Sequence, residues 1–152
     1  MTRARRHLLP VAALAIVATA GCGGGSSRRD ASPAGVVRAW SDALRHGEVA
    51  QAARYFEVPS LVANGGPPQQ LTTGAQVLEF NAGLPCGAKL VATERGPRGF
   101  TIATFVLTER PGPGTCGAGV GSTARTAFRV RGGKITDWLR VQDIPAAPAV
   151  QV

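Results

Sequence analysis

The sequence has few of the residues that carry most enzyme and metal chemistry. Its 152 residues include two histidines and three cysteines, aromatic residues make up 5%, and no CxxC pair occurs. Because zinc sites are built from closely spaced cysteines and histidines, we expect no metal site, and we also expect no cofactor. None of Ser41, Ser60 and Ser122 lies in a GxSxG motif or has an evident histidine partner, which disfavours a nucleophilic triad.

Lysine is also scarce, whereas arginine is abundant. Arginine outnumbers lysine 15 to 2 and the formal net charge is +8, as is common in proteins of high-G+C bacteria such as actinobacteria. Alternation places Arg125, Arg129 and Arg131 on one strand face and predicts a basic surface. This surface is either a solvated sheet face or a site for anionic lipid headgroups, a cell-wall polymer or an acidic partner. No aromatic side chains interleave with these arginines, so we expect no nucleic-acid partner.

The N-terminal segment has the pattern of an export signal. Residues 2–7 are basic and polar, and residues 8–20 form an uncharged apolar run. This run of about 13 residues is shorter than the roughly 18 to 20 apolar residues of a spanning helix. The sequence therefore predicts export rather than a transmembrane anchor.

Residues 19–22 (TAGC) follow the apolar run. They resemble the bacterial lipobox, although threonine stands where leucine is usual. The resemblance implies a lipoprotein signal peptide at 1–21 and a lipid on Cys22, with palmitate among its acyl chains, that tethers the protein to the outer face of the cell membrane. The alternative is a freely secreted protein with an unmodified cysteine.

The other two cysteines predict a disulfide. With Cys22 lipidated, Cys86 and Cys116 remain in an oxidising compartment, where paired thiols oxidise. The alternative is two unpaired buried thiols.

The rest of the chain divides into a tether at 22–31, a folded domain at 32–143 and a C-terminal tail at 144–152. Ser32 and Pro33 start an amphipathic helix that ends before Gly47. The pattern that follows predicts three further elements: a short helix from Val49 to Phe56, a short strand at 60–64 and a helix from Gly74 to Ala82, with Val77, Leu78 and Phe80 facing inward.

From residue 88 the period changes to that of strands. Four segments are rich in Val, Ile, Thr and Phe, and Gly/Pro turns separate them; these segments are 89–95, 99–110, 120–131 and 134–141. Gly132-Gly133 predicts a hairpin between the last two. The pattern indicates four long antiparallel strands.

Two stretches carry a resemblance to a known family. Residues 39–56 read AWSDALRHGEVAQAARYF and residues 128–141 read FRVRGGKITDWLRV. They resemble the opening and the ending of NTF2-like (SnoaL-like) domains. The resemblance implies an α+β fold: a cone in which N-terminal helices pack on a curved antiparallel sheet of about four long strands. This family's fold hosts isomerases, cyclases and dehydratases as well as non-catalytic modules, so the fold leaves the function open.

The family's cone predicts a pocket. We expect its lining to include Trp40, Tyr55, Asn64, Phe80, Phe105 and Asp137. In the ketosteroid isomerase branch a phenol and a carboxylate carry the reaction, and Trp40 and Asn64 stand at those places. An amide takes no proton near neutral pH, which disfavours this route.

Asp137 is the candidate catalytic residue. Strict alternation puts it on one face with Ile135 and Leu139, where an inward carboxylate could act as acid or base. The alternative is that it lies near the strand mouth and pairs with an arginine.

Three functions follow from these observations. The leading one is a membrane-tethered, non-catalytic binding module for a small apolar ligand or a partner protein. The second is a small enzyme of the isomerase, cyclase or hydratase type that uses Asp137. The third is an envelope assembly protein that acts through its sheet face, as a homodimer or with another envelope protein.

Overall fold

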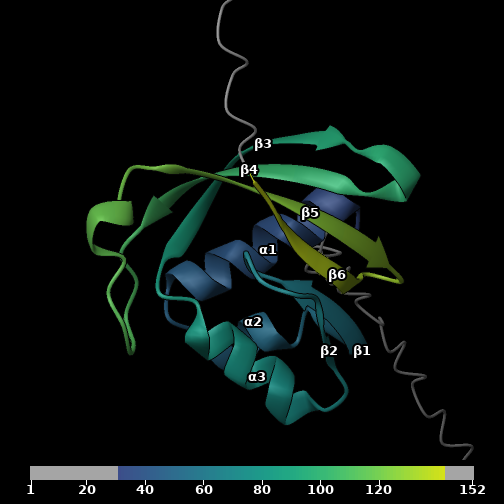
Figure 1. The fold of residues 1–152 in the computed structure, drawn as a ribbon, viewed down its shortest axis with the longest axis horizontal. Coiled ribbons are helices and arrows are strands. Elements are labelled where there is room, and N and C mark those ends of the chain that lie inside the picture. The colour runs from purple at the N-terminus through teal and green to yellow at the C-terminus, as the bar shows by residue number, and fades with distance from the viewer. Residues whose placement is uncertain (1–30, 143–152) are drawn as a thin grey trace, which may run out of the picture.

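The computed structural model describes residues 31–142 (Figure 1). The predicted signal peptide, the lipidated Cys22, nearly all of the tether and the tail lie outside the described residues. The helices are α1 (Pro33–Arg45), α2 (Val49–Ala53) and α3 (Gly74–Gly83), with 3₁₀ turns at Pro97–Gly99 and Gly117–Gly119. The strands are β1 (Phe56–Ala63), β2 (Gln69–Leu71), β3 (Gly87–Arg95), β4 (Thr101–Thr108), β5 (Thr123–Arg131) and β6 (Lys134–Val141). Across the described range, none of the helices has the length and apolar character needed to cross a membrane.

Helix α1 begins and ends where the sequence predicts. The Ser32 side chain accepts a hydrogen bond from the backbone N–H of Gly35 at 3.1 Å, and Pro33 occupies the first turn. Gly47 follows the helix with φ +79°, a conformation that other residues adopt at a cost. The buried side of α1 consists of Val36, Val37, Trp40, Ser41, Ala43 and Leu44.

The sheet is mixed and has six strands in the order β2-β1-β6-β5-β4-β3. The four long strands predicted from the sequence are β3 to β6, and they pair antiparallel. Strand β1 joins β6 in parallel and β2 extends the edge, so two additions to the four predicted long strands make the sheet mixed. The sheet curves around α1, which lies inside it, while α3 closes the lower side (Figure 1). The result is an α+β cone.

Strand β1 starts earlier than predicted. Phe56 was expected to end the second helix, but it begins the strand and pairs with Ile135. The N–H of Ile135 donates to the Tyr55 carbonyl at 2.7 Å, and the Phe56 ring is buried. These contacts join Tyr55 and Phe56 to a strand about 80 residues further along the chain. They outweigh the local helical pattern of the segment.

The core is an aromatic cluster centred on Trp40. Its indole lies 5.4 to 6.4 Å, centroid to centroid, from the rings of Phe56, Phe105, Phe128 and Trp138. Edge and tilted contacts of this kind favour aromatic pairs. The two tryptophans therefore fill much of the cone.

Helix α3 presents a face that differs from the prediction. Val77 is buried as expected, but Leu78 is 43% exposed and Asn81 is buried in its place. Asn81 donates to the Val77 carbonyl and accepts from Trp40 Nε1, both at 2.8 Å. This amide satisfies the Trp40 indole, a buried donor that would otherwise lack a partner.

Candidate functional site

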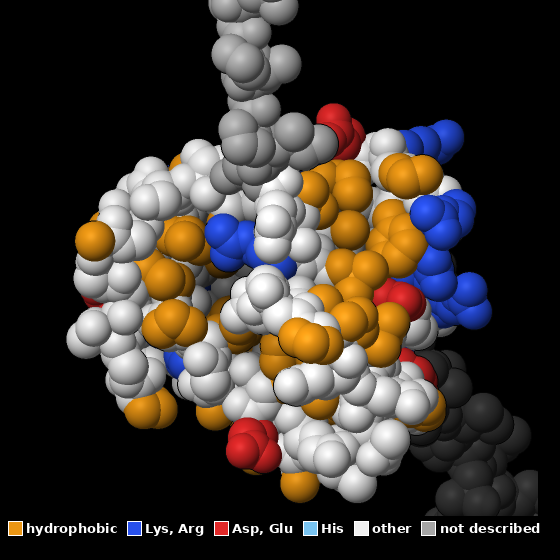
Figure 2. Space-filling view, in the orientation of Figure 1, with side chains coloured by type: hydrophobic (Ala, Val, Ile, Leu, Met, Phe, Trp, Pro, Cys, Tyr) orange, Lys and Arg blue, Asp and Glu red, His pale blue; other side chains and the backbone are white. Residues whose placement is uncertain are grey.

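A cavity of about 150 Å³ remains inside the cone, between the C-terminal half of α1 and the sheet. The face of the molecule drawn in Figure 2 has a hollow with basic side-chain atoms at its edge. The cavity is lined by Trp40, Leu44, Asn64, Leu84, Pro85, Cys86, Ala88, Phe105, Leu107, Ala124, Thr126, Trp138 and Arg140. Most of this lining is hydrocarbon, so the interior is suited to an apolar molecule.

Three of the six residues expected to line a single pocket do so: Trp40, Asn64 and Phe105. Phe80 packs instead on the rings of Phe56 and Trp138, and it borders grooves beside β2. Tyr55 is half-buried at shallow depressions next to α2. Phe80 therefore packs behind the Trp138 ring, which itself lines the cavity.

Asp137 lies on the outer face of the sheet and does not line the cavity. The register of β5 and β6 shifts here: Arg129 pairs with Asp137, but the next residue, Val130, pairs with Ile135. Thr136 is thus an extra residue, a β-bulge that puts Ile135 inside and Asp137 outside. The expectation of an inward acid is corrected, because strict alternation does not hold across a bulge.

The carboxylate of Asp137 belongs to a group of contacts on the outer face. Its Oδ1 is 3.7 Å from Arg129 Nη1, and its Oδ2 accepts the Thr136 hydroxyl at 2.7 Å. The Arg129 guanidinium also lies over the Phe100 ring, 4.2 Å from the centroid. This arrangement is the arginine pairing that the sequence left as the alternative for Asp137.

The predicted basic surface is largely neutralised by neighbouring acids. Arg125 forms an ion pair with Glu94 across β4, and Arg129 pairs with Asp137. Arg131 is exposed at the hairpin end of β5. Two of the three arginines are therefore already matched by acids on the same face.

The bulge places Trp138 and Arg140 on the inner face, a position that strict alternation along the strand does not predict. Trp138 pairs with buried Phe128, and Arg140 pairs with buried Thr126. The Trp138 side chain is 4% exposed, and its Nε1 has no hydrogen-bond partner within residues 31–142. Ile135 and Trp138 are both apolar and are separated by an odd number of positions, which indicates a bulge between two inward residues. This spacing is the sequence signal for the inward orientation of Trp138.

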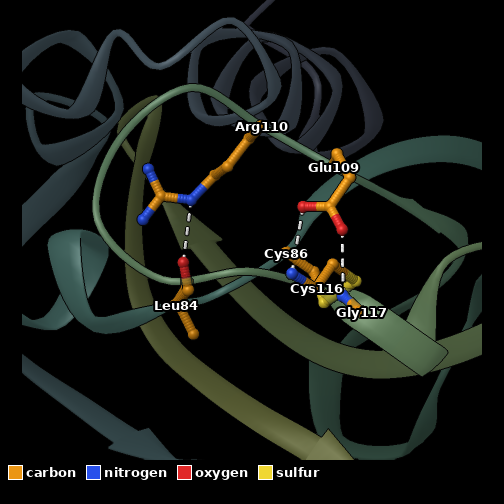
Figure 3. The surroundings of a disulfide bond; sticks show 6 residues. All are labelled: Leu84, Cys86, Glu109, Arg110, Cys116 and Gly117. Atoms are coloured by element: carbon orange, nitrogen blue, oxygen red, sulfur yellow. Dashed lines mark hydrogen bonds between the residues drawn. A yellow bond between two sulfur atoms is a disulfide. The ribbon is translucent and has the colours of Figure 1, made fainter.

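A disulfide ties a lining residue of the cavity to the loop between β4 and β5 (Figure 3). Cys86, a lining residue, is bonded to Cys116 in the loop between β4 and β5. The Glu109 carboxylate accepts the backbone N–H groups of Cys116 and Gly117 at 3.0 and 2.9 Å. These two hydrogen bonds lower the pKa of Glu109, because they favour its charged form.

Arg110 lies on the other side of this loop (Figure 3). Its Nε donates to the Leu84 carbonyl and its Nη2 to the Ala82 carbonyl, both at 2.8 Å. Burial lowers the pKa of Arg110, but the guanidinium satisfies carbonyls at the C-terminus of α3. No local pattern in the sequence indicates this role, since the partners lie 26 and 28 residues away.

The lining contains no group suited to proton transfer. It has no aspartate, glutamate, histidine or lysine, and its one cysteine is in the disulfide. Arginine stays protonated near neutral pH and amides do not titrate, so neither serves as a general base. No cluster of His, Cys, Asp and Glu in the described part of the chain could hold a metal ion.

Comparisons with known proteins bear on the fold. No protein-family model matches the chain, and no curated protein matches it. Among solved structures, it is similar to a candidate polyketide cyclase from Sinorhizobium meliloti (14% identity, TM-score 0.54, covering 70% of this chain and 93% of that one).

Two further structures are an NTF2-like protein of unknown function from Cytophaga hutchinsonii and a protein with a ketosteroid isomerase-like fold from Catenulispora acidiphila, in complex with trimethylamine. The first is 11% identical, with TM-score 0.52, covering 72% of this chain and 88% of that one. The second is 14% identical, with TM-score 0.51, covering 72% and 85%. At such identities the likeness concerns the fold and leaves the chemistry open. The chain thus has the NTF2-like fold, a curved sheet wrapped around its first helix.

Proposed function

We propose that this protein is a non-catalytic binding module whose conical cavity holds a small apolar ligand, tethered to the outer face of the cell membrane by a lipid on Cys22. The observation that carries the binding role is the composition of the cavity: its lining is mostly hydrocarbon and includes no proton-transfer group. An isomerase, cyclase or hydratase would need such a group beside its substrate.

The size of the cavity limits the ligand. Apolar cavities of about 150 Å³ hold molecules of the size of benzene. The aromatic cluster around Trp40 occupies the rest of the cone interior. A single ring or a short branched chain fits this space, whereas a steroid or a polyketide does not.

Native mass spectrometry tests the ligand. The full chain is produced with its export signal, purified in mild detergent, and its native and denatured masses are compared. We expect an excess mass that is lost on denaturation and that belongs to a small molecule. A protein that stays at its bare mass, even after incubation with benzene-sized compounds, would contradict the binding role.

The tether is tested by the mass of the N-terminal peptide and by cell fractionation. We expect a diacylglycerol-modified Cys22 in the wild-type protein and release from the membrane fraction in Cys22→Ala. An unmodified N-terminal peptide, together with unchanged membrane retention of the variant, would contradict lipid anchoring.

The outer sheet face favours a second candidate function, assembly with a second copy of this chain. Hydrophobic side chains gather over β5 and β6, bordered by basic ones (Figure 2). Ile102, Val106 and Leu139 are half-buried on this face. Because Arg125 and Arg129 are paired with acids on the same face, two copies could approach without burying unmatched like charges.

Sedimentation velocity of the full chain in detergent tests this assembly. We expect a concentration-dependent dimer that Leu139→Glu abolishes. Val120→Glu, at an exposed position in the β4–β5 loop, is the matched control and should leave the dimer intact. A monomer at every concentration would contradict self-assembly and leave the ligand site unaffected.

A further inference from the structure

We infer that the ligand of the cavity is a small apolar carboxylate, read by the Trp138 indole N–H and the Arg140 guanidinium. This inference rests on the proposed binding function and adds the chemical class of the ligand. It starts from two polar groups of the cavity lining, on Trp138 and Arg140, that have no partner within the described residues.

The two tryptophans of the cavity differ in one respect. The Trp40 indole donates to Asn81 at 2.8 Å, whereas Nε1 of Trp138 is buried with no partner in the described chain. Buried donors in folded proteins are nearly always paired. Because Trp138 lines the cavity, its orphan N–H is the group that we assign to a ligand acceptor. A ligand that supplies an oxygen atom there would remove this deficit.

Arg140 supplies a charge beside this donor. It is two residues from Trp138 on the same strand face, roughly 7 Å along β6, and it lines the same cavity. Within residues 31–142 it forms no ion pair, in contrast to Arg125 and Arg129 on the opposite face. It is exposed and lies at the mouth, so its charge stays hydrated until a ligand arrives.

The remaining polar groups agree with an anionic acceptor. Asn64 follows Ala63, which pairs with Leu139, so Asn64 and Arg140 are neighbours at the end of this pairing and line the same cavity. No acidic residue is in the lining to compete for the guanidinium. A carboxylate matches the planar fork of arginine, and a hydrocarbon body fills the interior. Inorganic phosphate has no apolar part to occupy that interior.

Benzoate and nitrobenzene test this inference as a matched pair, because the two have the same shape and differ in charge. Binding is measured by isothermal titration calorimetry on the full chain in detergent, with heats into detergent alone subtracted. We expect benzoate to bind roughly tenfold or more tightly than nitrobenzene. In ¹⁵N spectra the Trp138 indole signal should shift more with benzoate than that of Trp40, whose N–H is already bonded to Asn81.

Three variants complete the test. Arg140→Gln should remove the preference for benzoate and leave nitrobenzene binding unchanged, and Arg140→Lys should retain part of it. Arg125→Gln, on the outer face of the neighbouring strand, is the control and should behave as wild type. Equal affinities for the two probes, or an Arg140→Gln variant with the wild-type preference, would overturn the carboxylate inference while the binding function stands. Binding of neither probe would overturn both.

Discussion

The two faces of β5 and β6 handle their polar groups in opposite ways. On the outer face, Arg125 pairs with Glu94 and Arg129 with Asp137. On the inner face, the Trp138 N–H and the Arg140 guanidinium have no partner within the described chain. Paired charges satisfy one another within the protein, whereas unpaired donors beside an apolar cavity remain able to bind a ligand. The comparison separates groups that maintain the fold from groups that can meet a ligand.

The largest expected contrast between the faces is in stability. Phe128→Ala removes a fully buried ring that contacts Trp40, Phe105 and Trp138, and it should lower the free energy of unfolding by about 3 to 5 kcal/mol. On the outer face the Phe100 ring lies under the Arg129 guanidinium, and Phe100→Ala should lower the free energy of unfolding by roughly 1 kcal/mol. Urea unfolding of both variants measures the difference, and equal losses would contradict the assignment of the faces.

The next largest effect concerns the wall of the cavity. Replacing Cys86 and Cys116 together by alanine opens a crosslink that spans 30 residues, which should cost about 3 to 4 kcal/mol. Because Cys86 lines the cavity, ligand affinity should also fall. Thermal unfolding and the calorimetric titration check both results. A variant with wild-type stability and affinity would show that the loop does not support the inner face.

A smaller effect is expected for the acid on the outer face. Asp137→Asn breaks the 3.7 Å contact with Arg129; the Arg129 side chain is 26% exposed and that of Asp137 14%, so the loss should be about 1 kcal/mol. Ligand affinity should not change, since Asp137 is outside the cavity lining. A large loss of binding would mean that the acid acts on the inner face after all.

The smallest effect is the pH dependence due to Glu109. Its pKa in the folded protein is lowered from the ordinary value of 4.5 by the N–H groups of Cys116 and Gly117. The stabilisation is therefore complete above the unfolded pKa and is lost as the pH falls through the lowered, folded one. The difference in urea midpoint between wild type and Glu109→Gln should be constant near neutral pH and should shrink below about pH 4.5. Glu57→Gln, at an exposed position in β1, is the control; a difference that grows on acidification would contradict the assignment.

Local patterns predicted much of the fold. The Ser32 cap, Gly47 and the alternation of β5 rest on neighbours within a few residues, and the structure places them as expected. The parallel pairing of β1 with β6 was missed, because Phe56 meets Ile135 only once the chain has folded. The bulge at Thr136 was missed because strict alternation takes no account of an extra residue, and it reversed the faces of Asp137 and Trp138.

The sequence by itself determined the start and end of α1, the four long strands and the cysteine pair, since each depends on local geometry or on composition. Only the tertiary structure decided which side chains face the cavity. A single extra residue in β6 turned Asp137 out to Arg129 and brought Trp138 and Arg140 in. The physical reason is that side chains alternate along a strand, so one bulge inverts every assignment that follows it.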